Sequence, residues 1–376
     1  MSNRLPIALA TALAVLPASP AAAQTSDALY ARINALSGWE IRGYRFDPGL
    51  AVKSVSQWNI PLVLIAPVGR KMSVDLTTQV ASGSISSYGA GTETLSGLTD
   101  TQLRLLYTLE RDRLVTSLSV NLPTGQHSVS TSQFQVAGAV GANYLSFPIA
   151  NFGTAFGVTG GVAYARPAGA WNVGLSGSLR YLRDYAPFSD QPVSYSPGLE
   201  GRIRGGVDRL LGQRARILLG LTVSTFSTDV FTGTGTFVSG WYDPGTRYIG
   251  ELAVVRVVGR ATLTFAAWDL YRRAGTTNAL SSPETKDNVL NGELRLAYPL
   301  RPRLELEPLV GFRQWSPADY RGGRLYSAGV TARVGLTDRL SATVAGRFDD
   351  GWVFARGRGF ANLTGYGLTM FLRYQQ

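Results

Sequence analysis

Cysteine is missing from this chain, and histidine is nearly so, since 376 residues contain only His127. The absence of cysteine excludes a disulfide framework, a thiolate metal site and a thiol nucleophile. One histidine is too few for a zinc site built from imidazole ligands. Charge is scarce as well: charged residues make up 16 % of the chain, whereas soluble domains carry about 25 %.

Long hydrophobic runs are rare too. The run near the start, at residues 7–16, follows Arg4 and precedes the small residues Ala21-Ala22-Ala23. These are the parts of a secretory signal peptide, and the run is shorter than the roughly 20 apolar residues of a spanning helix. We therefore predict a cleaved signal peptide over residues 1–23. Because no later stretch has the length of a spanning helix, a membrane location requires a closed β-barrel, which pairs its backbone N–H groups within lipid.

What the chain does contain is alternation of apolar with polar or small residues, most clearly in its last segment. One face of this segment has an aromatic at each end and aliphatic residues between: Tyr366, Leu368, Met370, Leu372 and Tyr374. A strand places every second residue on the same side. Aromatic girdles flanking an apolar band are typical of membrane-spanning barrel strands. A water-soluble sandwich also alternates, but it has no reason to end its strands in tyrosine.

Turn residues separate the alternating segments along the chain. The short connections are expected at residues 67–70, 110–113, 166–169, 211–213, 258–260, 299–302 and 336–339. Longer polar stretches fall between them, at residues 82–96, 185–195, 228–246, 274–288 and 349–362. Short periplasmic turns that alternate with long external loops are the connection pattern of an outer-membrane barrel.

The predicted fold class is all-β, a transmembrane antiparallel outer-membrane β-barrel of about 14–16 strands. We expect the barrel over residues 49–376. Residues 24–48 are expected to form a short N-terminal segment, either a hatch or an extra strand ahead of the barrel. No internal repeat or linker indicates a second domain.

Charged residues on the polar faces of the strands indicate the lining of a lumen. A charge that faced lipid near the midplane would cost about 2–4 kcal/mol, so these side chains should point inward. The predicted lumen-lining residues are Arg104, Arg180, Arg202, Arg204, Glu251, Glu293, Arg295, Glu305, Glu307, Arg313, Arg333, Arg347 and Arg373, with Glu200 on the same grounds. They could form a water-filled constriction that selects permeants, or pair with one another and seal the lumen.

The net charge of +11 comes almost wholly from arginine, since Lys53, Lys71 and Lys286 are the only lysines. The arginines are spread through strands and turns rather than clustered, which argues against nucleic acid as a partner. The expected partners are outer-membrane lipid and lipopolysaccharide, the barrel-assembly machinery and a small-molecule permeant. Arg356 and Arg358, in an external loop, could meet lipopolysaccharide phosphates or form a basic solvated loop.

The strand pattern breaks at residues 145–156, around Pro148. Four apolar residues in this stretch, Phe147, Ile149, Phe152 and Phe156, are predicted to form a hydrophobic pocket or an inward-folded plug. A bulged strand or an ordinary loop would explain the same break.

Catalytic residues are not predicted, nor are a cofactor or a metal site. Ser128 and Ser130 lie near His127 in sequence, but a catalytic triad requires a nucleophile, a base and an orienting group brought together in space. No Gly-x-Ser-x-Gly elbow is present. We expect His127 to be a solvated loop residue and the protein not to be an enzyme.

Two short motifs resemble segments of a known family. Gly97-Leu98-Thr99-Asp100 precedes an alternating strand, and Asn121-Leu122-Pro123-Thr124-Gly125 closes the next one. They resemble the Gly-Leu-Gly-Asp and Leu-Pro-Thr-Gly pattern of the phenol-degradation meta-pathway transporter group, which is related to long-chain fatty-acid transport barrels. Thr99 stands where that pattern has glycine. The resemblance implies a barrel of about 12–16 strands in the outer membrane and passage of small hydrophobic molecules.

Together these observations predict a channel or transporter for small molecules in the outer membrane of a Gram-negative cell, with hydrophobic or aromatic compounds as permeants. Three alternatives stay open. A general porin that leans toward anions would follow from the arginine excess. A structural or adhesive barrel without transport and an outer-membrane hydrolase are the others.

Overall fold

The computed structural model describes residues 33–89, 91–109, 113–234, 239–278, 285–318, 322–355 and 359–376. The predicted signal peptide and the loop residues Arg356 and Arg358 lie outside the described residues. No helix in the described ranges has the length and apolar character needed to cross a membrane.

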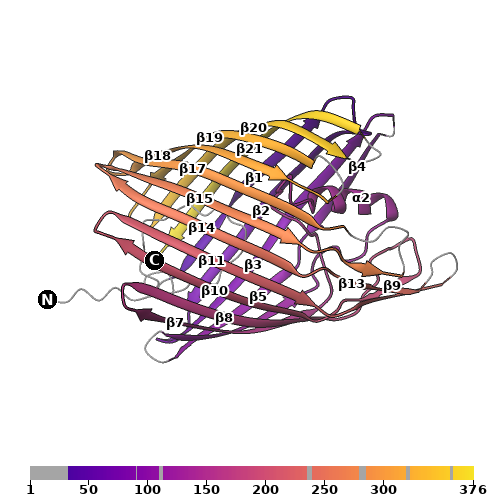
Figure 1. Ribbon diagram of the computed structural model, residues 1–376, viewed down its shortest axis with the longest axis horizontal. Helices are drawn as coiled ribbons and strands as arrows, with labels where there is room; N and C mark the ends of the chain where they lie inside the picture. Colours follow the sequence, from indigo (N-terminus) through magenta and orange to yellow (C-terminus); the bar gives the residue numbers. More distant parts are fainter. Residues whose placement is uncertain are drawn as a thin grey trace.

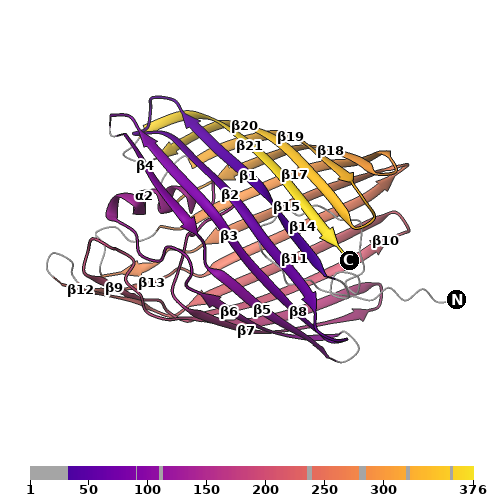
Figure 2. The same cartoon turned by 180° about the vertical axis from the view of Figure 1, so that it is seen from behind.

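One antiparallel sheet curls round until its two ends meet (Figures 1 and 2). The strands of this sheet are β1 (Asn34–Phe46), β2 (Val52–Pro67), β3 (Met72–Ser87), β4 (Gly91–Leu98), β5 (Thr101–Leu109), β6 (Leu114–Leu122), β7 (Gly157–Ala168), β8 (Trp171–Leu182), β10 (Glu200–Leu211), β11 (Ala215–Phe226), β14 (Arg247–Val258), β15 (Ala261–Arg272), β17 (Asp287–Arg301), β18 (Leu304–Trp315), β19 (Gly322–Gly335), β20 (Leu340–Ala355) and β21 (Gly359–Gln375).

Closure is made by the first and last strands. β1 pairs with β2 on one side and with β21 on the other, from Asn34 opposite Gln375 to Phe46 opposite Leu363. β4 and β5 occupy a single position, because both pair with the same edge of β3. Within the described residues the barrel therefore has 16 strand positions, which confirms the predicted all-β antiparallel barrel.

The barrel includes part of the segment expected ahead of residue 49. Residues 24–48 were predicted to form a hatch or an extra strand, and Asn34–Phe46 is a strand of the barrel itself. Its residues Glu40 and Arg42 lie on the same face as Tyr44, which packs against Phe147 of the segment that folds into the barrel between β6 and β7, so this face is inward.

Six of the seven predicted short turns fall at junctions between barrel strands, at the end where the C-terminus lies (Figure 1), and residues 110–112 of the seventh lie outside the described residues. Two of the predicted external loops are wrong, because residues 82–96 and 349–362 are mostly strand. Three of the strands concerned, β3, β20 and β21, have 16 or 17 residues, whereas crossing a membrane takes about 9–11. The extra length extends into water, where both faces of a strand tolerate polar residues.

The two faces of the wall follow the predicted parity. Leu368, Leu372, Phe265, Val330 and Val344 are exposed on the outer surface, while Leu263 is half-buried. Their neighbours in sequence face inward: Thr264 and Thr331 are buried, and Thr343 and Thr369 are half-buried. A closed barrel with an apolar exterior is the architecture of outer-membrane proteins, and this locates the chain in that membrane.

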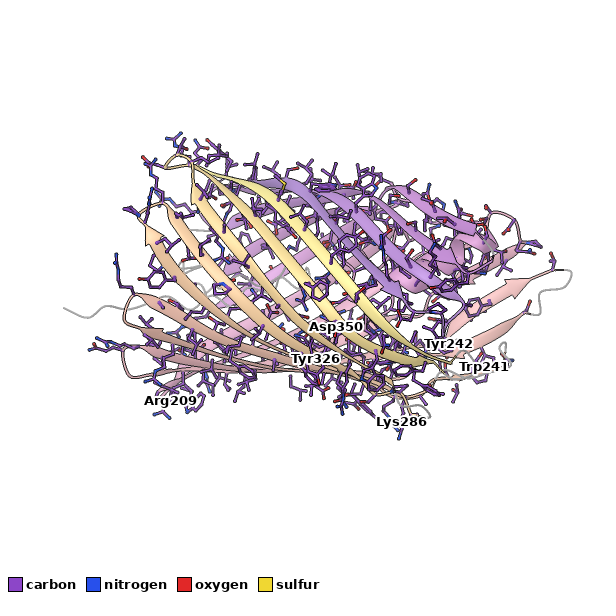
Figure 3. All side chains as sticks on the ribbon, turned by 90° about the horizontal axis from the view of Figure 1, so that it is seen from above. Arg209, Trp241, Tyr242, Lys286, Tyr326 and Asp350 are labelled. Atoms are coloured by element: carbon purple, nitrogen blue, oxygen red, sulfur yellow. The ribbon has the colours of Figure 1, made fainter. Side chains whose placement is uncertain are left out.

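The end opposite the C-terminus carries the larger connections. A four-stranded antiparallel sheet there is formed by β9 (Val193–Ser196), β12 (Asp229–Gly233), β13 (Gly240–Asp243) and β16 (Thr276–Thr277). Figure 3 shows Trp241, Tyr242 and Lys286 at this end and Arg209 at the other. The connection between β6 and β7 contains the helix α2 (Thr131–Val140), which lies at the same end (Figures 1 and 2).

Candidate functional site

The segment between β6 and β7, residues 123–156, folds into the barrel, and we call it the plug. It begins its helix with a capping box: the Ser130 hydroxyl accepts from the Gln133 N–H at 3.3 Å, and the Gln133 side chain accepts from the Ser130 N–H at 3.1 Å. These two bonds satisfy N–H groups that a helix start otherwise leaves without a partner. Ser130 therefore has a structural role.

The plug has an apolar side that packs against the inner wall. Val136, Val140 and the predicted residues Phe147, Ile149 and Phe152 are buried in one cluster with wall residues of β1, β2, β3, β19 and β21: Tyr44, Val55, Ala81, Leu325 and Leu363 among them. The Phe147 ring meets the Tyr44 ring edge-on, with centroids 5.5 Å apart. The break in the strand pattern thus marks an inward-folded segment, and three of its four predicted residues come together.

Phe156 does not belong to this cluster. It is 39 % exposed and immediately precedes β7. Along β7 the exposed residues are those at the same parity, such as Val162 and Tyr164, so Phe156 lies on the outer face of the wall. The prediction failed here because the chain rejoins the sheet one residue later, and strand alternation then fixes which side a residue faces.

Gly83 on β3 makes room for the plug. A Cβ atom at this position would lie 3.2 Å from the Phe152 ring and 3.2 Å from the Val140 side chain. Any larger side chain would press on both, so the plug is seated on the bare backbone of the wall.

Polar side chains of the wall hold the backbone of the plug. The Gln57 amide donates to the Ile149 carbonyl at 2.7 Å and accepts from the Ile149 N–H at 2.9 Å. Arg313 donates to the Tyr144 carbonyl at 3.0 Å. Tyr44 donates to the Leu145 carbonyl at 2.9 Å, and Arg42 donates to the Ser146 carbonyl. Buried carbonyls need such partners, so these contacts define the docked position.

Ser146 has a backbone φ of +53°, and it is the one non-glycine residue with positive φ in the described ranges. This conformation costs a residue with a side chain of order 1–3 kcal/mol. The strain lies at the residue whose carbonyl accepts a hydrogen bond from Arg42 of β1.

The wall itself is broken beside the plug. β4 pairs with β3, and no described strand pairs with its other edge. The helix α2 lies along that edge, where the Gln133 amide donates to the Thr94 carbonyl at 3.3 Å. β6, which continues the pairing of β5, ends at Leu122, since the chain leaves the wall there to form the plug.

The two motifs that carry the family resemblance meet at this break. The Asp100 carboxylate accepts hydrogen bonds from the Asn121 amide at 2.8 Å and from the Gly125 N–H at 3.1 Å. The Thr124 hydroxyl donates to the Thr99 carbonyl at 3.0 Å. A Cβ at Gly125 would lie 2.2 Å from the Phe152 carbonyl oxygen, so this position requires glycine.

The predicted lumen residues all lie on inward faces, and most are paired. Arg204 meets Glu251 at 2.7 Å, Arg295 meets Glu293 at 2.7 Å, and Arg347 meets Asp349 at 2.8 Å. The remaining contacts from predicted residues are Arg104 with Asp75, Arg202 and Arg180 with Glu200, Arg333 with Glu305 and Glu307, Arg313 with Asn291, and Arg373 with Asn34.

Several inward residues were missing from the predicted set, among them Asp75, Asp208, Arg247, Arg272 and Asp349. Asp349 is 1 % exposed and shares its face with Arg347 two positions earlier. Strand parity would have identified Asp349 as an inward residue if the predicted strand had not been ended at residue 349. Gln57 and Tyr44 carried no signal, because their role depends on the plug.

His127 and Ser130, which were considered for catalysis, have structural contacts instead. His127 is exposed and its ring meets Tyr185, with centroids 6.5 Å apart. No group of three or more histidine and acidic side chains that could hold a metal ion occurs in the described ranges. The expectation that the protein is not an enzyme stays a prediction.

Comparisons with known proteins give likeness in overall shape. No protein-family pattern matches the sequence, and no curated protein matches it. Among solved structures, a FadL homologue from Pseudomonas aeruginosa has 11 % identity, covering 96 % of this chain and 95 % of that one, with a TM-score of 0.49. An anion-selective porin from Comamonas acidovorans has 12 % identity, covering 92 % of this chain and 98 % of that one, with a TM-score of 0.44. The CymD monoaromatic hydrocarbon channel has 9 % identity, covering 92 % of this chain and 88 % of that one, with a TM-score of 0.43.

Proposed function

We propose that this protein is an outer-membrane channel for small hydrophobic molecules, aromatic compounds among them. The observation that carries the proposal is the apolar plug docked beside a break in the wall. The resemblance of the two motifs at that break to the phenol-degradation transporter group supports the same class of permeant.

The proposed route runs from the outside to the plug and then sideways, past the edge of β4 that pairs with no described strand and is lined by α2. A hydrophobic molecule gains free energy by leaving water for an apolar surface, at about 25 cal/mol per Å². It has no reason to continue through a lumen lined by paired charges such as those of Arg295 and Glu293. A lateral exit would deliver it into lipid without crossing that layer.

A disulfide between the plug and the wall tests whether movement is needed. The chain has no cysteine of its own, and Gly83 and Val140 are close enough for Gly83→Cys with Val140→Cys. We expect the oxidised double variant to lose most uptake of a hydrophobic probe such as labelled toluene, in cells that lack other channels for it. Reduction should restore uptake. The reduced double variant and Val140→Cys alone are the controls, because Gly83→Cys alone would press on the Val140 and Phe152 side chains.

Measurements of ion conductance distinguish the proposed channel from the porin and from the structural barrel. With the plug docked, we expect the wild type to conduct ions poorly in planar bilayers, and Arg42→Ala to raise conductance by weakening an anchor. Arg45→Ala, on the outer face of the same strand, is the matched control. A wild type that already conducts ions well would make the anion-leaning porin the better account. Neither uptake nor conductance in any variant would indicate a structural or adhesive barrel.

A further inference from the structure

Two arginines face each other on the inner wall. Arg247 on β14 and Arg272 on β15 are direct cross-strand partners, on strands that lie side by side (Figure 1). Like charges directly opposite each other destabilise a sheet unless an anion neutralises them. The pair is therefore a candidate site for a negatively charged ligand.

Two carboxylates of the described residues lie near this pair, and the charge of one of them, Glu200, acts on Arg247. Asp287 lies 3.8 Å from Arg272, and it also accepts from the Trp315 indole at 2.5 Å. Glu200 is shared by Arg202 and Arg180, at 2.7 and 3.7 Å. Among the described residues, the group contains the guanidiniums of Arg180, Arg202, Arg247 and Arg272 and the carboxylates of Glu200 and Asp287.

Arg247 still has a guanidinium N–H without a hydrogen-bond acceptor in the described part of the chain. In the described ranges no carboxylate lies within salt-bridge distance of it, and its Nε is buried without a hydrogen-bond partner. The guanidinium lies over the Phe226 ring, 5.4 Å from the centroid. A planar guanidinium binds a carboxylate through two parallel N–H bonds, and stacking on an aromatic ring preserves that geometry.

Contacts connect this site to the plug. Trp315, which binds Asp287, packs against the Tyr144 ring of the plug, with centroids 5.7 Å apart. Arg313, on the same strand as Trp315, binds the Tyr144 carbonyl. Asp287, Trp315 and Tyr144 thus link Arg272 to the plug through successive contacts.

We infer that Arg247 and Arg272 form a binding site for the carboxylate of a small aromatic acid, with Phe226 beside the ring-bearing part of the ligand. This inference rests on the proposed function only for its place on the permeation route. Arg247 supplies the bidentate contact, and Arg272 supplies the second positive charge.

Equilibrium binding tests the site independently of transport. For purified full-length protein in detergent, we expect benzoate to bind at least tenfold more tightly than benzamide, its neutral isostere, by isothermal titration calorimetry. Phosphate, added as a competitor, should displace benzoate only weakly because it lacks the ring. Equal affinities for benzoate and benzamide in the wild type would overturn the inference without any variant.

Variants locate the site. Arg247→Gln should weaken benzoate binding about tenfold or more and leave benzamide binding unchanged, while Arg247→Lys should keep part of the affinity. Arg260→Gln, in the exposed turn at the other end of the same hairpin, is the control. Unchanged benzoate affinity in a folded Arg247→Gln protein would also overturn the inference. Benzoate binding without uptake of hydrophobic probes would refute the proposed function and leave this site standing.

Discussion

The carboxylate of Asp100, at the break between β4 and β5, accepts a hydrogen bond from the backbone N–H of Thr154, in the plug, at 2.7 Å. The Thr154 hydroxyl donates to the same carboxylate at 2.8 Å. One side chain therefore joins the broken wall to the returning end of the plug. The position of the break and the position of the plug are coupled through it.

Replacing Asp100 by alanine should loosen this junction. The variant leaves the donors of Asn121, Gly125 and Thr154 without their acceptor, at a cost of about 1–3 kcal/mol for each donor that water does not reach. We expect faster proteolysis within residues 123–156 and a higher ion conductance. Asp338→Ala, in an exposed periplasmic turn, is the control. Unchanged proteolysis would show that Asp100 does not hold the plug.

The two faces of β21 should respond differently to charge. Leu368 is on the outer surface, while Thr369 faces the lumen opposite Glu40. Leu368→Arg should destabilise the barrel in lipid by about 2–4 kcal/mol if it lies near the midplane. Thr369→Arg should cost less, because an inward guanidinium meets water and a carboxylate. Urea unfolding in lipid vesicles measures both, and equal losses would contradict the assigned faces.

Removing the last strand should prevent assembly. β21 pairs with β20 and with β1, so deletion of residues 365–376 leaves two edges without hydrogen-bond partners in lipid. We expect the truncated protein to stay out of the membrane fraction and to lose heat-modifiable migration on gels. Folded, membrane-bound protein after this deletion would contradict the closure between β1 and β21.

Glu307 should be worth more to stability than its neighbour Glu305. Both bind Arg333, but Glu307 is 1 % exposed at its side chain and Glu305 is 38 % exposed. Glu307→Gln removes a buried carboxylate that contacts both Arg333 and Arg295, and breaking a buried ion pair costs up to about 3–5 kcal/mol. Glu305→Gln removes a solvent-screened pair worth about 0–1 kcal/mol. The free energy of unfolding in lipid vesicles, measured for both variants, tests this ranking. Equal losses for Glu307→Gln and Glu305→Gln would refute it.

The N-terminus of α2 should respond to acid. Its first residue, Thr131, donates its N–H to the exposed Asp190 carboxylate at 2.9 Å, and this bond lowers the pKa of Asp190 below its usual value. A lowered pKa in the folded state means that the stabilisation is complete at neutral pH and disappears as pH falls through that pKa.

A spin label on Gln135→Cys, on the exposed side of α2, should therefore be immobile at pH 7 and more mobile below about pH 4. In an Asp190→Asn background the label's mobility should change less with pH. Identical pH profiles in the two backgrounds would exclude Asp190 as the sensor.

Local pattern was sufficient for much of the fold. Alternation in segments such as 366–374 predicts strands, and the short turns predict where they end, because strand periodicity and turn chemistry are properties of neighbouring residues. The same parity placed Arg295, Arg333 and Arg347 inside, since lipid excludes charge from the other face. The break at residues 145–156 likewise pointed to Phe147 and Phe152.

The alternation pattern did not predict which segments come together in three dimensions. Nothing near Asn34 in sequence shows that β1 closes the barrel against β21, because closure joins residues more than 300 positions apart. Whether Phe156 lies in the plug or on the outer wall depended on where the chain rejoins the sheet.

The sequence by itself determined a transmembrane barrel with a charged interior and an irregular apolar segment. Only the tertiary structure decided that this segment docks on Gln57, Tyr44 and Gly83, and that the Nε of Arg247 is buried without a hydrogen-bond partner among the described residues. The physical reason is that alternation is set by the backbone geometry of adjacent residues, whereas hydrogen bonds and charge compensation inside a barrel are made between strands whose order and register exist only once it has closed.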